Sequence, residues 1–323
     1  MAITMAQALN TALHDAMASD DRVVTFGEDV GALGGVFRIT DRLTERFGET
    51  RCFDTPLAES GIIGTAIGMA LYGWKPVVEI QFDGFVYPAF EQITSHLAKL
   101  RNRSRGKVAV PVVVRVPYGG GIGAVEHHSE SPETYFLHTA GLKVVTPGTP
   151  ADAYSLLREA ITHPDPVIFF EPKRRYWLKE EVSLPVRTHA FGHAVVRRPG
   201  TTATIVAYGP MVRTCLDAAT AAEQEGWDLE VLDLRTLNPL DTGALIGSVR
   251  RTGRAVVVHE ASVFAGFGAE IAAVVTERAF YDLEAPVLRV GGFDIPYPAA
   301  KLEEFYLPDT DRILDAVERS LGY

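Results

Sequence analysis

The sequence has few cysteines and no long apolar run. Cys52 and Cys215 are the only cysteines among 323 residues, which excludes a disulfide scaffold and favours a reducing compartment. The most apolar uncharged stretch, residues 60–74, is too short to span a bilayer. The N-terminus carries neither a signal-peptide pattern nor a transit pattern. These absences predict a cytoplasmic protein that does not enter a membrane.

Positive charge is also scarce. The chain has 31 Lys and Arg against 41 Asp and Glu, a net charge of −10, which argues against a nucleic-acid-binding protein. A basic cluster at residues 99–107 is interpreted as a helix end and loop, because cations are favourable at helix C-termini. A hydrophobic content of 47% is typical of a folded enzyme and excludes a disordered chain.

Short runs rich in Val and Ile alternate with helical patterns along the whole chain. Because the runs are continuously apolar, we expect strands buried on both faces, in an α/β fold with a parallel sheet between helices. The predicted strands are 23–26, 77–82, 108–116, 143–146, 167–170, 203–207, 229–234, 255–259 and 287–290. The predicted helices include an N-terminal one, one near residues 90–100, one starting at Thr149–Pro150 with Asp152 completing a capping box, and 212–225, 242–251 and 268–280.

The length predicts two domains. Residues 181–200 are charged and interrupted by proline and glycine, which is typical of a connecting segment. We therefore expect a first α/β domain at 1–180, a linker at 181–200 and a second α/β domain at 201–323.

Glu59 is the first residue that could carry chemistry. It is the only acid between Asp54 and Glu79 and opens a helix rich in glycine. An acid at a helix N-terminus is also favourable without any function, so the position alone leaves both interpretations open. Thr55 lies four residues before Glu59, and a capping box needs three.

His127 and His128 follow a glycine-rich segment. Adjacent side chains point in different directions, and zinc-ligand spacings are absent, so one imidazole acting as an acid or base is favoured over a metal site. A pair of loop histidines bonded to nearby carboxylates is the competing interpretation. The residues that follow, Ser129 and Glu130, are candidates to orient the ring of His128.

The glycine-rich segment itself matches G-x-G-x-x-A through Gly119, Gly121 and Ala124. Pro117 and Pro132 leave little room for a following helix, and no acid occurs about 20 residues later to bind a ribose. A dinucleotide-binding loop is therefore rejected. Gln81 and Phe85 follow another predicted strand, where ligands of parallel sheets bind, although core packing is the commoner role of a phenylalanine.

Eight ordered motifs together resemble one known family. The chain is similar to the beta subunit of the thiamine-diphosphate-dependent decarboxylating component of 2-oxo acid dehydrogenase complexes. The similarity covers nearly the whole chain, and it implies a transketolase-like pyrimidine-binding domain followed by a transketolase C-terminal-like domain. The motifs are FGED at 26–29, FDTPLAE at 53–59, EIQF at 79–82, HSESPE at 128–133, GLKVV at 141–145, FFEPK at 169–173, LDLRT at 232–236 and GGFDIPYP at 291–298.

The resemblance implies roles for individual residues. Glu59 would bond a ring nitrogen of the cofactor's aminopyrimidine and promote its activation, and Phe85 would pack on the pyrimidine. Leu57 and Gln81 would line the same pocket. His128 matches the family's active-site histidine, whereas His127 occupies a variable position. None of these is expected to bind a metal, although some members hold a structural potassium ion on backbone carbonyls near residues 110–113 and 160–165.

The resemblance also implies partners. An alpha subunit would supply the diphosphate and magnesium site, whose Gly-Asp-Gly motif is absent here, in an alpha2-beta2 heterotetramer. The acyl group would pass to a lipoyl acyltransferase core, and we expect the acidic tail after Pro308 to be exposed and to dock a basic module. Several motifs resemble branched-chain rather than pyruvate enzymes, so the implied substrate is a 2-oxo acid of the 2-oxoisovalerate type.

Three alternatives stay open. One is a pyruvate dehydrogenase beta subunit or a broad-specificity member. Another is a stand-alone transketolase or deoxyxylulose phosphate synthase, although those enzymes carry both halves in a much longer chain. The last is a non-enzymatic binding module, against which Glu59, Phe85 and His128 together argue.

Overall fold

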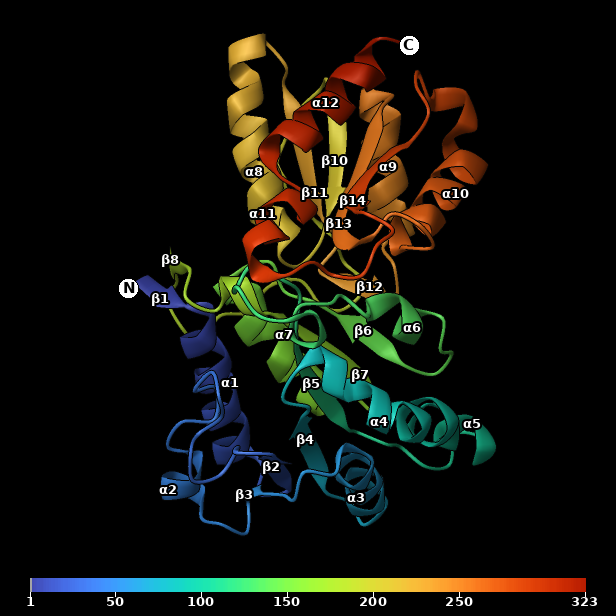
Figure 1. Cartoon of the computed structure of the whole chain (residues 1–323). Coiled ribbons are helices and arrows are strands. Elements are labelled where there is room, and N and C mark those ends of the chain that lie inside the picture. The colour runs from blue at the N-terminus through green and yellow to red at the C-terminus, as the bar shows by residue number, and fades with distance from the viewer. Residues whose placement is uncertain (1) are drawn as a thin grey trace.

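The computed structural model describes residues 2–323 as two α/β halves (Figure 1). The N-terminal half, blue to green, lies below the C-terminal half, yellow to red, and β12 lies at their boundary. The strands are β1 (Ala2–Thr4), β2 (Val23–Gly27), β3 (Cys52–Asp54), β4 (Lys75–Glu79), β5 (Val113–Tyr118), β6 (Lys143–Val145), β7 (Val167–Pro172), β8 (Lys179–Glu181), β9 (Val195–Arg198), β10 (Ala203–Ala207), β11 (Leu229–Asp233), β12 (Thr236–Asn238), β13 (Ala255–Ser262) and β14 (Leu288–Gly292).

The helices alternate with these strands. They are α1 (Met5–Ser19), α2 (Leu43–Phe47), α3 (Glu59–Leu71), α4 (Val86–Glu91), α5 (Leu100–Arg103), α6 (Glu133–Leu137), α7 (Pro150–Thr162), α8 (Met211–Ala221), α9 (Thr242–Thr252), α10 (Phe267–Ala279), α11 (Glu303–Tyr306) and α12 (Thr310–Leu321). Within residues 2–323, no helix is both long and apolar enough to cross a bilayer.

The first sheet has the strand order β12-β6-β7-β5-β4-β2-β3, parallel except for β12. Its central strands are buried on both faces, and neighbours such as Val77 and Val78 enter different cores. Helices α1 and α7 cover one face, while α3 and α4 cover the other. The prediction of a parallel sheet between helices is confirmed.

The second sheet has the order β14-β13-β10-β11-β9, with β9 antiparallel. Helices α8 and α12 cover one face, and α9 and α10 cover the other, where the core is continuous with that of the first half. Strand β9 lies inside the segment 181–200, and β12 crosses over to pair with β6.

Several strand boundaries differ from prediction, among them the start of β5 and the end of β4. β5 begins at Val113 rather than at residue 108, because Pro111 has no N–H to continue a ladder and the amide of Val110 instead donates to the carbonyl of Pro164 at 3.0 Å. β4 ends at Glu79 rather than at Phe82, where a 3-10 turn over Asp83–Phe85 begins.

The C-terminal tail is not the exposed segment that the sequence predicted. Helix α12 buries Ile313, Ala316 and Val317 in the core of the second half. Only its outer face is open to a partner. Deleting the residues after Pro308 would therefore damage the fold as well as any docking surface.

Thr149 caps α7 as predicted, since its hydroxyl accepts from the amide of Asp152 at 3.2 Å. The carboxylate of Asp152 does not complete a capping box. It turns toward Arg235, whose Nε donates to Asp152 Oδ1 at 2.8 Å. Asp152, which the sequence predicted to complete a capping box, therefore forms a long-range ion pair instead.

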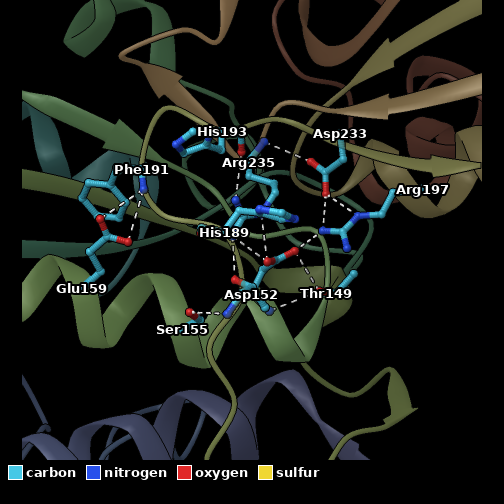
Figure 2. A network of polar contacts seen from close by, with 11 residues as sticks. Thr149, Asp152, Ser155, Glu159, His189, Phe191, His193, Arg197, Asp233 and Arg235 are labelled. Atoms are coloured by element: carbon cyan, nitrogen blue, oxygen red, sulfur yellow. Dashed lines mark hydrogen bonds and ion pairs between the residues drawn. The ribbon is translucent and has the colours of Figure 1, made fainter. Parts of the chain in front are cut away.

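That ion pair belongs to a buried network between the two halves (Figure 2). Arg197 donates to Asp233 at 2.8 Å and also to Asp152, so two carboxylates share two guanidinium groups. Arg235 further donates to the carbonyl of His189 at 2.8 Å. The network therefore ties the segment 181–200 to both halves of the molecule.

A second polar contact between the halves involves a single buried carboxyl. The hydroxyl of Tyr208, at the end of β10, donates to Glu133 Oε1 of α6 at 2.8 Å. Glu133 Oε2 is buried without a partner. Burial raises the pKa of Glu133 to about 7. This carboxyl is therefore protonated over much of the range in which an ordinary glutamate is ionised.

We expect the Glu133→Gln variant to lose part of the pH dependence of stability. Because the pKa of Glu133 is higher in the folded protein than in the unfolded chain, its protonation stabilises the fold. This stabilisation is complete below the unfolded pKa of 4.5 and is lost as the pH rises through about 7. The wild-type free energy of unfolding should therefore fall by roughly 3 kcal/mol more than that of the variant between pH 4 and 8. Urea titrations at both pH values measure the difference, and parallel pH profiles would contradict it.

Candidate active site

The predicted site residues follow three parallel strands of the first sheet, β3, β4 and β5. Leu57 and Glu59 follow β3, Gln81 and Phe85 follow β4, and His128 lies in a loop after β5. Between β3 and β4 lies β2, whose own continuation is Glu28-Asp29. Because these strands are parallel, their carboxyl ends meet at one edge of the sheet, where ligands bind in open α/β folds.

Glu59 is the first residue of α3, and its N-cap residue Ala58 provides no side-chain cap. The Glu59 side chain is buried, with 6% of the residue exposed. Its charge acts on Glu28, whose pKa is raised first by burial and then by Glu59 and Asp29. Glu28 Oε1 is buried without a hydrogen-bond partner. The site thus contains two carboxyls, of which sequence reasoning singled out one.

Glu28 was missed although it lies in a motif that carried the family resemblance. The available signal was its position directly after a fully buried strand, where a charged side chain is costly unless it has a role.

Gln81 and Leu57 lie in the segments that follow β4 and β3. Gln81 Nε2 donates to Asp29 Oδ2 at 2.9 Å, and Asp29 has a left-handed backbone with φ of 57°. Leu57 is 79% exposed. An apolar side chain that exposed, beside a buried acid, marks a surface suited to being covered by a ligand or a partner.

Phe85 and His128 are brought into contact. Their ring centroids are 5.2 Å apart in an edge-to-face arrangement, and Phe82 lies 4.0 Å from the His128 ring. The Nδ1 atom of His128 is buried without a partner. His127 is half exposed, lies 6.0 Å from Phe85 and pairs with Glu126 at 3.6 Å. An unpartnered ring nitrogen next to two aromatic rings is available to a bound group.

The loop that carries His128 is held through hydrogen bonds to its backbone groups. Lys173 Nζ donates to the carbonyl of His128 at 2.6 Å and forms an ion pair with Asp83. Asp83 Oδ2 accepts from the amide of Glu130 at 2.8 Å. The Ser129 hydroxyl has no partner. The prediction that the Ser129 and Glu130 side chains orient the ring was therefore wrong, because Asp83 and Lys173 hold the loop instead.

The same surroundings set the protonation of these groups. Burial, His127 and Lys173 lower the pKa of His128, so its ring is mainly neutral at pH 7. Burial raises the pKa of Asp83 to about 6 even though Lys173 opposes that change. A neutral imidazole can take up a proton and give it back near neutral pH.

Among residues 2–323, no group of three or more His, Cys, Asp or Glu side chains is placed to hold a metal ion. Both cysteines are free and buried. The basic cluster at 99–107 forms the end of α5 and a loop, where Arg101 pairs with Asp165 at 2.7 Å.

Comparison with known proteins places this site in a family. The chain matches the transketolase pyrimidine-binding domain over residues 1–177 and the transketolase C-terminal domain over residues 192–313. It is similar to the 3-methyl-2-oxobutanoate dehydrogenase beta subunit of Mycobacterium tuberculosis, with 59% identity over 320 residues, 99% of this chain and 92% of that protein.

Two further similarities agree. The beta subunit of the pyruvate dehydrogenase E1 component of Leifsonia xyli is 57% identical over 324 residues, 99% of this chain and 95% of that protein. A solved structure described as a split gene transketolase, inactive beta4 tetramer, superposes with a TM-score of 0.82 at 25% identity, covering 100% of this chain and 99% of that one.

Proposed function

Because the chain belongs to the family of 2-oxo acid dehydrogenase beta subunits built from transketolase-type domains, we propose that it is the beta subunit of a branched-chain 2-oxo acid dehydrogenase. With an alpha subunit, it decarboxylates acids of the 2-oxoisovalerate type and passes the acyl group to a lipoyl-lysine of an acyltransferase core. The observation that carries the proposal is that Glu59, Phe85 and His128 all follow strands whose carboxyl ends lie at one edge of the first sheet, where Phe85 contacts His128.

The residues at this edge fit thiamine diphosphate held by its pyrimidine ring. Buried Glu59 would hydrogen-bond a ring nitrogen of the bound cofactor, and Phe85 would offer it an aromatic surface. Glu28 Oε1 is an unpartnered acceptor whose carboxyl interacts electrostatically with Glu59. Leu57 and Gln81 complete the pocket. The bound cofactor supplies the carbon nucleophile that attacks the 2-oxo group. Glu59 holds the proton at the ring nitrogen, and Phe85 excludes water from that face.

His128 has a separate task in this proposal. When the acyl group moves to a lipoyl disulfide, one sulfur forms the thioester and the other is released and needs a proton. The ring of His128 carries a buried nitrogen without a partner and a pKa shifted below its ordinary value. Once protonated from solvent, the imidazolium can deliver that proton to the released sulfur, and the neutral ring takes up another proton from solvent before the next turnover.

An alpha subunit is required because this chain carries half of the cofactor site. The Gly-Asp-Gly motif that binds the diphosphate and magnesium in the family is absent from the sequence. Helix α3 offers a surface for the partner, since its outward positions carry no charge. Gly61, Gly64 and Gly68 share one face of that helix, and a Cβ at Gly68 would meet no atom within 4 Å.

We expect Gly64→Leu to block assembly with the alpha subunit while leaving the chain folded. A Cβ at Gly64 would meet only Gln92 Oε1, at 3.9 Å, so the added side chain points into space that the partner would fill. Gly247→Leu is the matched control, because Gly247 is also helical and has open space around it. Size-exclusion chromatography of co-expressed subunits measures assembly. An alpha2-beta2 species formed equally well by both variants would contradict the assignment of α3.

A structural potassium ion is a further part of the proposal. The segments 110–113 and 160–165 lie side by side, joined by the hydrogen bond between the amide of Val110 and the carbonyl of Pro164. Their remaining backbone carbonyls are the kind of ligand that potassium takes in the family.

Activity of the reconstituted enzyme tests the function directly. The chain is co-expressed with the Gly-Asp-Gly-containing chain from the same organism, and decarboxylation is followed with an artificial electron acceptor. We expect turnover of 2-oxoisovalerate with higher kcat/KM than of pyruvate, and none from this chain alone. A preference for pyruvate would instead favour a pyruvate dehydrogenase, as the Leifsonia relative is named. Normal turnover by the isolated chain would contradict the shared site.

The transketolase alternative has to be separated by the same assay. Chain length does not exclude it, since the solved structure described as a split transketolase matches this chain over its full length. Its identity is 25%, against 59% for the dehydrogenase subunit. Ketol transfer between sugar phosphates without turnover of 2-oxo acids would favour the transketolase.

A further inference from the structure

The glycine-rich loop at residues 119–124 precedes His128 and is held by the opposite half of the molecule. The amide of Gly121 donates to Glu303 Oε1 at 2.7 Å, and the amide of Gly123 donates to Glu303 Oε2 at 3.0 Å. The amide of Gly120 donates to Glu260 Oε2 at 3.1 Å. Two carboxylates from the C-terminal half therefore accept hydrogen bonds from three backbone amides of this loop.

The loop has the backbone of an anion-binding nest. Gly119, Gly121 and Gly123 have φ of 80°, 83° and 70°, the left-handed region that favours glycine. Left-handed residues in a loop can turn backbone N–H groups toward an anion. Here the amides of Gly121 and Gly123 meet the carboxylate of Glu303, and the amide of Gly120 meets that of Glu260. The pattern that resembled a dinucleotide loop thus has a ligand within the chain, namely the carboxylate of Glu303.

Glycine is also required at positions 119 and 120 because side chains of the C-terminal half lie close to the loop backbone there. A Cβ at Gly120 would lie 1.8 Å from the hydroxyl oxygen of Tyr297, and a Cβ at Gly119 would lie 2.6 Å from Glu260 Oε2. The Tyr297 hydroxyl donates to Glu303 Oε1 at 2.7 Å. Glu303 is 6% exposed, so three donors satisfy a buried carboxylate whose desolvation would otherwise be costly.

The loop joins this carboxylate to the histidine. The amide of Gly119 donates to the carbonyl of Glu130 at 2.9 Å, which closes the loop at its base. Asp83 and Lys173 hold the end that contains His128, as described above. Glu303 and Glu260 fix the opposite end, and Glu303, which accepts two of its amides, lies 175 positions after His128.

We propose that Glu303 is a positioning residue for acyl transfer, which acts through the glycine loop by keeping His128 in place. This rests on the proposed function, because the step that depends on His128 is transfer to the lipoyl group. The C-terminal half thereby takes part in the chemistry of a site that lies on the N-terminal sheet. A displacement of about 1 Å at a reacting group can cost about a hundredfold in rate.

The test uses the assembled alpha2-beta2 enzyme with Glu303→Ala and the control Glu304→Ala, whose side chain is exposed on the neighbouring position. Glu303→Ala should slow transfer to a lipoyl domain by about ten- to a hundredfold. Decarboxylation with an artificial acceptor should change by less than about threefold, and Glu304→Ala should leave both rates unchanged. Equal losses in both assays would overturn the proposal.

A double variant separates positioning from a general structural role. In a His128→Ala background, Glu303→Ala should cause no further loss of lipoyl-dependent rate, because the residue it positions is gone. An additional loss as large as that in the wild-type background would overturn the proposal. Tyr297→Phe keeps the carboxylate and removes one donor, so it should give the same pattern with a smaller effect, even if Glu303→Ala assembles poorly.

Hydrogen exchange tests the contact independently of activity. Amides in the peptide spanning 119–132 should exchange faster in Glu303→Ala than in Glu304→Ala, since two of them lose their acceptor. Unchanged exchange would overturn the proposal. If exchange rises while the wild-type enzyme turns over no 2-oxo acid, the contact stands and the proposed function fails.

Discussion

Replacing His128 by alanine is expected to slow acyl transfer to a lipoyl domain by about 10²–10⁴-fold, the usual cost of losing one positioned acid or base. The ring contacts both Phe82 and Phe85, and its buried Nδ1 has no partner within the described residues. Its backbone carbonyl is fixed by Lys173, so the variant should keep the loop in place. The loss should therefore come from the missing imidazole.

The role of His128 is tested by comparing lipoyl-dependent acyl transfer with decarboxylation. Decarboxylation with an artificial acceptor needs no proton on a lipoyl sulfur, so His128→Ala should affect it much less. His127→Ala is the matched control, because His127 is a neighbouring histidine that is half exposed and paired with Glu126. Equal losses in both assays would move His128 to substrate binding or decarboxylation. If His127→Ala were severely impaired and His128→Ala were not, the role would belong to His127 instead of His128.

Glu59→Gln should slow cofactor activation by about 10²–10⁴-fold without unfolding the protein. Glutamine can hydrogen-bond a ring nitrogen but cannot exchange a proton with it. The substitution also removes the charge that raises the pKa of Glu28, so we expect no loss of stability from it. Loss of activity and preserved stability together would separate chemistry from folding.

Exchange of the cofactor's thiazolium proton for deuterium, measured in the assembled tetramer, is the direct readout. Glu270→Gln is the control, because Glu270 is also an acid in the first turn of a helix. Assembly and thermal unfolding of both variants should match the wild type. An unchanged exchange rate in Glu59→Gln would remove Glu59 from the mechanism.

Much of the local structure follows from the sequence alone. Continuous Val and Ile runs identified most strands, because a strand buried on both faces has no polar side to alternate with. The N-cap at Thr149 was equally local, and so was the end of the predicted helix 212–225, where α8 continues as a 3-10 turn over Ala222–Glu225 that Gly226 ends with φ of 75°. The family resemblance, carried by ordered motifs, was confirmed by the relatives.

Contacts between distant segments could not be predicted in this way. The strand order of the first sheet decides that Glu28 comes next to Glu59 and that Phe85 meets His128, and sequence spacing does not contain that order. Asp83 and Lys173 are 90 positions apart, and both look like ordinary charged residues until the fold buries them as a pair. Asp152 likewise matched a capping box in the local sequence, but in the structure its carboxylate forms an ion pair with distant Arg235.

In the glycine-rich loop at 119–124, the backbone conformation depends on the local sequence, whereas the bound acceptor depends on the tertiary structure. The sequence showed a glycine-rich segment that does not fit a dinucleotide loop, and its glycines permit the left-handed conformations found at Gly119, Gly121 and Gly123, because glycine adopts them without strain. Which acceptor fills the loop was decided by the tertiary structure. Glu303 lies 180 positions or more from the amides it binds, and only the packing of the C-terminal half on the first sheet brings its carboxylate there.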